Sequence, residues 1–186
     1  MTNTNTVLLT FILGATTITW LSRKPLRHPG SHGFYRFFVW QGILSLFILH
    51  HPIWPSDVFN APKYLSSILM LASIFLVVAG WFELKRKGNA SPSRKDDALF
   101  RFEKTTSLVS SGIFRYIRHP MYTSLLLLAW GAFCQRPTAP SIVIVVLTTI
   151  FLFLTARSDE KECLDYFGDT YQSYKEKTWA FVPYVY

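Results

Sequence analysis

Five blocks of apolar residues occupy most of the chain, and they constrain the fold more than any other feature. The longest covers residues 64–84, YLSSILMLASIFLVVAGWFEL, and holds its one acidic residue, Glu83, near its end. The other blocks cover residues 7–21, 34–49, 121–134 and 141–156. A membrane-spanning helix needs about 20 predominantly apolar residues. The blocks therefore predict an all-α integral membrane protein with about five transmembrane helices.

The last two blocks are separated only by the short segment QRPTAP. Its two prolines break helices and favour a tight reversal. Residues 121–156 are therefore expected to form a hairpin of two antiparallel helices. The blocks at residues 7–21 and 121–134 are short for a full crossing at about 1.5 Å per residue. Either their helices extend into the flanking residues, or the last two blocks form a re-entrant hairpin.

Basic residues are distributed unevenly among the connecting segments. Of the 19 Lys and Arg residues, all except Lys63 and Arg136 lie in the loop between the first two blocks, counting Arg36 at its far edge, in the segment after the third block, or after the fifth. Cytoplasmic loops carry the excess of Lys and Arg in membrane proteins. This pattern predicts an N-terminus outside and a C-terminus in the cytoplasm. It also attributes the net charge of +8 to topology and anionic headgroups, which argues against nucleic-acid binding.

The blocks divide the chain into four parts. Three N-terminal helices are expected within residues 1–84, a cytoplasmic segment over 85–120, the hairpin over 121–156, and a cytoplasmic helical tail over 157–186. In the tail, Gly168 is expected to end one helix, and a second short helix is expected over residues 169–177. No basic region precedes the first block, so a cleaved signal peptide is not expected. Neither Cys134 nor Cys163 has a metal-site spacing, and a disulfide between them is not expected.

Polar side chains gather in two places that the hairpin brings together. Residues 85–118 begin as a solvated loop, KRKGNASPSRKDD, and continue as ALFRFEKTTSLVSSGIFRYIRHP, whose apolar residues include Leu99, Phe100 and Phe102. An interfacial amphipathic segment is one interpretation of that stretch. A tight hairpin also places residues 118–122 beside residues 157–160, so an arginine, a histidine, a tyrosine and two carboxylates should meet at the membrane edge.

These motifs resemble a known family of membrane enzymes. TSLVSSGIFRYIRHPMY, then the pair DE, then FGDTYQSYKEKTWAFVP, follow the pattern of the isoprenylcysteine carboxyl methyltransferase and phospholipid methyltransferase family. The resemblance covers roughly the last 85 residues, and the first three blocks match only in being hydrophobic. It implies a membrane enzyme that transfers a methyl group from S-adenosylmethionine, with an active site on the cytoplasmic side, no metal, and a lipid or lipidated small molecule as substrate.

The resemblance also implies a set of cofactor contacts around the fourth and fifth helices. They are Thr106, Ser107, Leu108, Val109, Phe114, His119, Pro120, Met121, Tyr122, Asp159 and Glu160. The chain departs from the family pattern in three places. Asp159 stands where Glu is usual, which shortens its reach but keeps the charge. Phe114 stands where Tyr is more usual and Ala180 where a basic residue is frequent, and these two changes affect the expected substrate contacts.

The chemistry expected of the site depends on the methyl acceptor. A carboxylate is already ionised at pH 7, whereas a thiol with a pKa of about 8.5, or an amine, must lose a proton. Glu160, Asp159 or His119 is the candidate base for such acceptors. Arg157 is the candidate that orients a carboxylate, with an ordinary helix-face ion pair as its alternative role. An isoprenylated cysteine carboxylate, a phospholipid amine and a small lipophilic thiol or amine all remain open, as does the oligomeric state.

Two other classes share parts of this pattern. Membrane sterol and isoprenoid reductases, which use NADPH, resemble it but carry Asn before the Tyr in an RHxNY segment, where this chain has Met121. A non-catalytic membrane protein with the same fold is the other alternative.

The tripeptide Arg-His-Pro occurs twice, beginning at Arg27 and at Arg118. The first copy is followed by GSHG, with no acidic residue nearby in sequence, and is interpreted as a basic turn facing headgroups. The second copy opens a membrane helix beside the acidic pair. We therefore expect His119, and not His28, to belong to the site.

Overall fold

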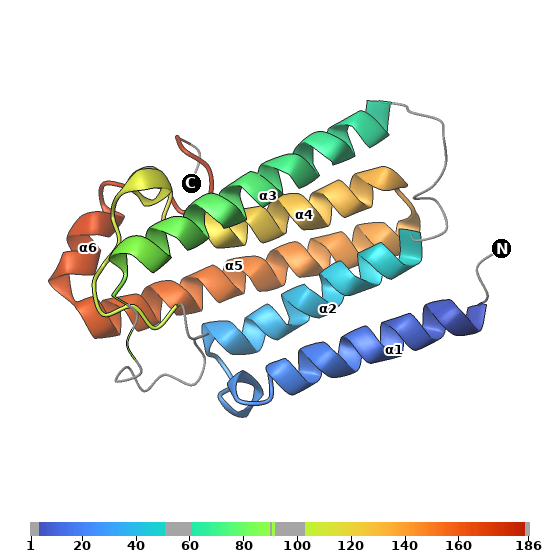
Figure 1. Ribbon diagram of the computed structural model, residues 1–186, viewed down its shortest axis with the longest axis horizontal. Helices are drawn as coiled ribbons and strands as arrows, with labels where there is room; N and C mark the ends of the chain where they lie inside the picture. Colours follow the sequence, from blue (N-terminus) through green and yellow to red (C-terminus); the bar gives the residue numbers. More distant parts are fainter. Residues whose placement is uncertain (1–3, 51–60, 90, 92–102, 185–186) are drawn as a thin grey trace.

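The computed structural model describes residues 4–50, 61–89, 91 and 103–184, and in this part of the chain all the regular structure is helical (Figure 1). Five long helices are α1 (Thr4–Leu21), α2 (His32–His50), α3 (Ala61–Lys87), α4 (Pro120–Gln135) and α5 (Ala139–Phe167). The short elements are the 3₁₀ turns η1 (Pro25–Arg27) and η3 (Gly112–Arg115) and the helix α6 (Asp169–Lys175). The predicted all-α class is confirmed.

Each predicted apolar block lies inside one of the long helices. Three of them, α1, α3 and α5, are long and apolar enough to cross a membrane. Helix α5 continues well beyond its apolar block, as far as Phe167. Gly168 ends it with a φ of 56°, a left-handed conformation that glycine adopts without strain, and α6 follows directly. The helix end predicted at Gly168 is therefore correct, and α6 is two residues shorter than predicted.

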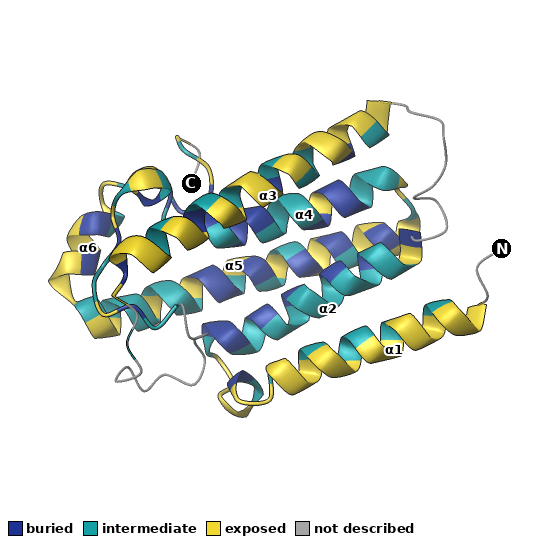
Figure 2. Ribbon diagram, viewed as in Figure 1, coloured by how far each residue is buried: buried dark blue, intermediate teal, exposed yellow. Residues whose placement is uncertain are grey.

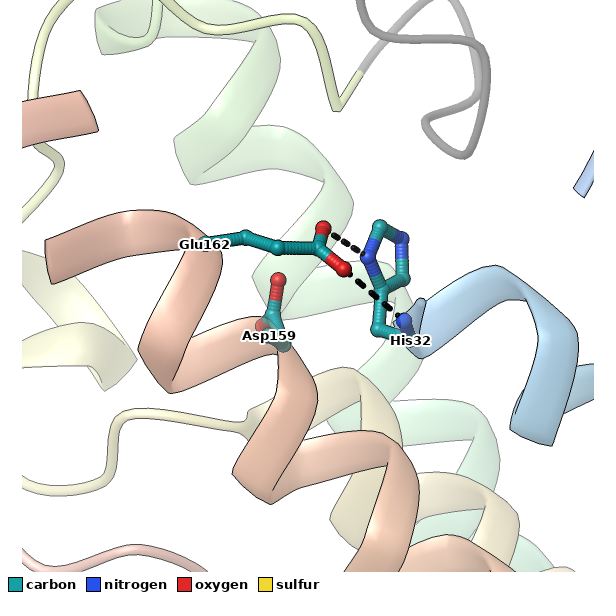
Figure 3. A group of neighbouring side chains, drawn as sticks. All are labelled: His32, Asp159 and Glu162. Atoms are coloured by element: carbon teal, nitrogen blue, oxygen red, sulfur yellow. Dashed lines mark hydrogen bonds and ion pairs between the residues drawn. The ribbon is translucent and has the colours of Figure 1, made fainter. Parts of the chain in front are cut away.

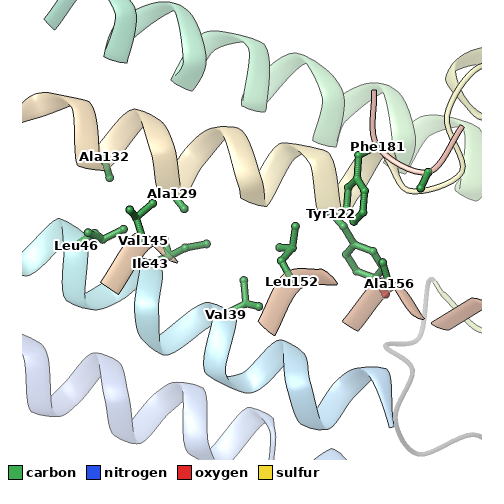
Figure 4. Close-up of a cluster of buried hydrophobic side chains, with 11 residues drawn as sticks. Val39, Ile43, Leu46, Tyr122, Ala129, Ala132, Val145, Leu152, Ala156 and Phe181 are labelled. Carbon is green, nitrogen blue, oxygen red and sulfur yellow. The ribbon is translucent and has the colours of Figure 1, made fainter. Parts of the chain in front are cut away.

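Helices α2 and α5 pack against each other along matching stripes of buried residues. On α2 the buried positions His32, Arg36, Val39, Ile43, Leu46 and His50 recur every three or four residues. On α5 the stripe is Ser141, Val145, Thr148, Leu152 and Thr155. A spacing near 3.5 residues keeps one face of a helix turned toward a partner over many turns. The apolar members of both stripes form the core together with side chains of α4 (Figure 4).

Helix α3 packs along α4 on the other side of the bundle (Figure 1). The Ser66 hydroxyl donates to the Gly131 carbonyl at 2.7 Å and accepts from the Gln135 amide at 2.8 Å. A Cβ at Gly131 would lie 2.9 Å from Met70 Cγ, so the helices approach through the missing side chain. Helix α1 contacts α2 and is exposed over most of its surface (Figure 2).

After α6 the chain returns to the start of α4. Ile117 and Trp179 form a parallel β-bridge. The backbone N–H of Arg118 donates to Trp179 O at 2.7 Å, and that of His119 donates to Ala180 O at 3.1 Å. The tail is thereby fixed against the residues that precede α4. The apolar residues Leu99, Phe100 and Phe102, which suggested an interfacial segment, lie outside the described residues.

The closest approach between α2 and α5 gives a test of this packing. A Cβ at Gly42 would lie 2.0 Å from Thr148 Oγ1. We expect Gly42→Ala to lower the unfolding free energy by about 1–3 kcal/mol, the usual cost of overpacking, and Thr148→Ala to recover much of it in the double variant. Thermal unfolding in detergent measures both. A double variant no more stable than Gly42→Ala would contradict the proposed clash.

Candidate active site

A pocket lies where the start of α4, the end of α5, α6 and the segment before η3 meet. It is lined by Leu84, Glu103, Thr105, Leu108, Val109, Phe114, Arg118, His119, Pro120, Met121, Tyr122, Asp159, Cys163, Phe167, Tyr171 and Tyr174. Eight of the eleven residues that the resemblance assigned to the cofactor are in this lining. The three outside it are Thr106, Ser107 and Glu160.

His119 is the N-cap residue of α4, and Pro120 occupies the first turn, where its missing N–H costs no helical hydrogen bond. The imidazole is 4% exposed. Its Nδ1 lies 3.4 Å from Asp159 Oδ2, its Nε2 lies 3.3 Å from Glu160 Oε1, and its ring stacks on Tyr122. Burial alone would lower the pKa of His119, but its contacts with the two carboxylates outweigh burial and raise the pKa above the ordinary value.

Glu160 binds cations that belong to the protein itself. Its carboxylate accepts from Arg118 Nε at 2.9 Å and from Lys175 Nζ at 2.7 Å, in addition to its contact with His119. The Arg118 guanidinium also donates to the backbone carbonyls of Lys175 and Thr178. Glu160 therefore joins α5 to the start of α4 and to the end of α6.

The two residues of the acidic pair, Asp159 and Glu160, therefore lie in different environments. Asp159 lines the pocket, whereas Glu160, one residue later on the helix, does not. Arg157 is exposed on α5 and lies outside this lining. Among the described residues, Arg118 is the arginine that lines the pocket.

Thr106 and Ser107 hold the backbone next to the pocket. Their N–H groups donate to Gly88 O, and the Thr106 hydroxyl donates to Asn89 O at 2.8 Å. These bonds tie the segment that carries Leu108 and Val109 to the end of α3.

Two tyrosines of α6 complete the wall. Tyr171 and Tyr174 come from the FGDTYQSY motif, and both are buried. The Tyr174 hydroxyl donates to Phe114 O at 2.7 Å. Burial raises the pKa of both phenols well above the ordinary value, so they stay neutral at physiological pH.

His32 is a residue of the site that sequence reasoning missed. Its backbone N–H donates to Glu162 Oε1 at 2.9 Å, and its Nδ1 contacts Glu162 Oε2 (Figure 3). Asp159 lies beside this pair, with ligand-type atoms of all three residues within 4.8 Å of one another (Figure 3). The first Arg-His-Pro copy itself is exposed at Arg27 and His28. The residue of this segment that contacts an acidic side chain is His32, four positions after His28.

Arg36 and Glu103 form a second pair that the sequence did not reveal. The guanidinium of Arg36, which is 4% exposed, donates to both carboxylate oxygens of Glu103, at 2.7 and 2.9 Å. A signal for Arg36 was present, because a charged residue inside an apolar helix usually has a functional partner. No comparable signal marked Glu103.

Comparison with known families decides where this chain belongs. The model of the phospholipid methyltransferase family matches residues 63–169, which include nearly all of α3, the whole of α4 and α5, and most of the pocket lining. The chain belongs to the phospholipid methyltransferase family. The range that the family model matches does not include α2, which carries His32 and Arg36, or the tail beyond the start of α6.

Three curated relatives show how varied the related proteins are. A methanethiol S-methyltransferase of a Pseudomonas species is 26% identical over 148 residues, covering 79% of this chain and 54% of the relative. A protein-S-isoprenylcysteine O-methyltransferase of Schizosaccharomyces pombe is 29% identical over 80 residues, covering 42% and 34%. A Delta(14)-sterol reductase of Mus musculus is 27% identical over 147 residues, covering 75% and 34%.

The chain therefore spans about half the length of the Pseudomonas relative and a third of the other two. No solved structure gives a significant match.

The raised pKa of His119 makes stability depend on pH. The folded protein keeps the His119 proton to a higher pH than the unfolded chain, whose histidines titrate at about 6.5. The stabilisation is complete below that value and is lost as pH rises through the raised pKa. We expect the thermal midpoint to fall more steeply as pH rises above about 6.5 in the unaltered protein than in His119→Asn. Parallel pH curves for the two proteins would contradict this assignment.

Proposed function

We propose that this chain is an S-adenosylmethionine-dependent methyltransferase that acts at the membrane on a lipophilic or amphipathic acceptor. The observation that carries the proposal is the pocket beside α4, where Asp159, His119 and the tyrosines converge with an apolar wall. We also propose that this end of the bundle faces the cytoplasm, since Lys85, Arg86 and Lys87 lie at the same end of α3.

The residues of the pocket suit the chemistry of S-adenosylmethionine. Its ammonium and sulfonium cations match the Asp159 carboxylate and the faces of the nearby aromatic rings. Its carboxylate matches Arg118 and the first backbone N–H groups of α4. Its adenosine matches the apolar wall that includes Val109 and Phe114. The volume of this open pocket is about 110 Å³, which is smaller than the whole ligand. Part of the ligand must therefore lie in the mouth of the pocket, or the lining must move.

Methyl transfer needs no nucleophile from the protein, because the acceptor attacks the methyl carbon. The protein has to hold donor and acceptor in line and exclude water, and positioning of this kind supplies a large part of a rate enhancement. The named relatives act on a thiol and on an isoprenylcysteine. A lipophilic acceptor that meets the donor at the membrane edge is consistent with both.

An NADPH-dependent sterol reductase is the second candidate, and the mouse relative is the observation that favours it. The methyltransferase is preferred because Pro120 and Met121 precede Tyr122 where the reductase pattern has Asn before the Tyr. Equilibrium binding of labelled S-adenosylmethionine and of NADPH to the purified protein separates the two. Saturable NADPH binding without S-adenosylmethionine binding would replace the proposal.

Asp159 gives the most direct test of the donor site. Removing its charge with Asp159→Asn leaves the side-chain size almost unchanged and removes the anion that faces the ligand cations. We expect S-adenosylmethionine to bind about 10-fold or more weakly, consistent with the loss of one charge-assisted contact of about 1.5–3 kcal/mol. Asp165→Asn, on the same helix and outside the pocket lining, is the matched control. Equal affinities of Asp159→Asn and the unaltered protein would remove Asp159 from the site.

The two Arg-His-Pro copies give a second test. We expect His119→Ala to lower methyl transfer by about 10-fold or more, because the imidazole fills the space between the two carboxylates and Tyr122. We expect His28→Ala, in an exposed turn, to retain nearly full activity. Transfer of labelled methyl groups to lipids of a membrane extract measures both variants. A larger loss in His28→Ala would reverse the assignment.

A further inference from the structure

A second cavity lies against the first, between α2 and α3 and over α4. Its volume is about 400 Å³, within the range usual for small-molecule sites. Most of its wall is apolar and includes Trp40 of α2, Trp81 and Val78 of α3, and Leu125 of α4. Trp81 and Val78 are also partly exposed on the outer surface of α3, where the cavity can receive an apolar molecule from the bilayer.

The two cavities share three residues, which are Glu103, Met121 and Tyr122. In-line transfer requires the reacting atoms of donor and acceptor to approach within about 3–3.5 Å. If the donor occupies the first cavity, an acceptor in the second cavity meets it at this shared wall. The chemistry of the shared wall therefore determines which acceptor head group is accepted.

The ion pair between Arg36 and Glu103 is the only charged part of the second cavity's described lining. Because the guanidinium donates to both carboxylate oxygens, the pair is neutral overall. A carboxylate acceptor would add an uncompensated negative charge to this apolar cavity, and an ammonium would add a positive one. Burying an unpaired charge is costly, so the cavity favours a neutral head group.

We propose that the second cavity binds the methyl acceptor as a neutral thiol on an apolar body, and that Glu103 accepts the thiol proton. This assignment rests on the methyltransferase function proposed above. The thiol proton passes to a carboxylate oxygen of Glu103, and the sulfur lone pair then forms the bond to the methyl carbon. The electron pair of the broken carbon–sulfur bond stays on the donor sulfur. Glu103 afterwards releases the proton to water.

Arg36 can pair with an anion both before and after that proton transfer. Before the transfer its guanidinium faces the Glu103 carboxylate, and after it the same guanidinium can face the thiolate. The cavity therefore keeps one cation and one anion during the proton transfer. After methyl transfer the product sulfide is neutral, and the release of the proton from Glu103 restores the anion. Arg36 is a positioning residue in this scheme, and Glu103 is the residue that touches the acceptor.

The first test uses the unaltered protein and three eight-carbon acceptors that differ only in head group: octanethiol, octanoate and octylamine. Methyl transfer from labelled S-adenosylmethionine should occur with octanethiol and be at least about 10-fold slower with the other two. Preferential methylation of octanoate or octylamine, or methylation of none of the three, overturns the thiol assignment. Failure to bind S-adenosylmethionine at all would instead overturn the function on which the assignment rests.

The second test separates proton transfer from structure with Glu103→Gln. An alkanethiol is neutral near pH 7, whereas an arenethiol is acidic enough to be largely ionised at slightly alkaline pH. We expect Glu103→Gln to slow methylation of octanethiol by about 100-fold or more, the usual effect of losing a general base, and to affect an arenethiol much less. Equal losses with both thiols would indicate a structural role and overturn the assignment of Glu103.

Glu83→Gln is the matched control for that substitution. Glu83 pairs with Lys87 and Ser111 and lines neither of these two cavities, so both thiols should react as with the unaltered protein. Unchanged binding of S-adenosylmethionine shows that each variant is folded. If Glu103→Gln does not fold, the comparison of the three head groups in the unaltered protein still decides the acceptor.

A third measurement detects the acceptor without the donor. Octanethiol should raise the thermal midpoint of the unaltered protein, because a ligand that binds the folded state stabilises it. Val78→Phe, which fills the cavity, should abolish the shift. Val143→Phe, on an exposed part of α5 outside the lining, should retain it. An undiminished shift in Val78→Phe would place the acceptor elsewhere and overturn the proposal.

Discussion

The antiparallel contact between α2 and α5 determines where the charged groups of the site lie. In the middle of the bundle, residues such as Ile43 and Val145 fill this contact with apolar side chains. The same spacing of three and four residues continues to the end of both helices. It leads on α2 to Arg36 and His32, and on α5 to Asp159 and Glu162. The same helical repeat therefore positions both the apolar core and the polar cluster at the ends of the two helices. Because the cluster continues the packed core, its side chains are held rigidly.

Glu160 fixes the position of the start of α4, as the stripe of buried residues fixes the position of α2. It stands outside the stripe and faces Arg118, His119 and Lys175. A largely buried carboxylate with three cationic neighbours can keep its charge, and each neighbour comes from a segment that must be in place. The two adjacent acidic residues therefore serve different purposes. Asp159 is available to a ligand, whereas Glu160 holds α4, α5 and α6 in the arrangement that forms the pocket.

The helices and much of the pocket lining were predictable from the sequence, because they depend on residues that are close together in it. The lengths of the apolar blocks predicted the helices, the two prolines of QRPTAP predicted the reversal between α4 and α5, and Gly168 predicted the end of α5. The resemblance then placed eight residues in the pocket lining. The residues that were missed, His32, Arg36 and Glu103, come from segments that local sequence does not bring together. Arg36 and its partner Glu103 are 67 positions apart in the sequence, and His32 and its partner Glu162 are 130 positions apart. Only the helix packing determines such pairs.

The β-bridge between Ile117 and Trp179 bears on how the protein is made. All five long helices are synthesised before residues 174–181. At that stage Arg118 and His119 still have no carbonyl partners from the tail, and Glu160 has no Lys175. The pocket is therefore completed only by the last part of the described chain, after the five long helices have been synthesised. A chain that stops before residue 174 would therefore contain all five long helices and still lack a complete pocket wall.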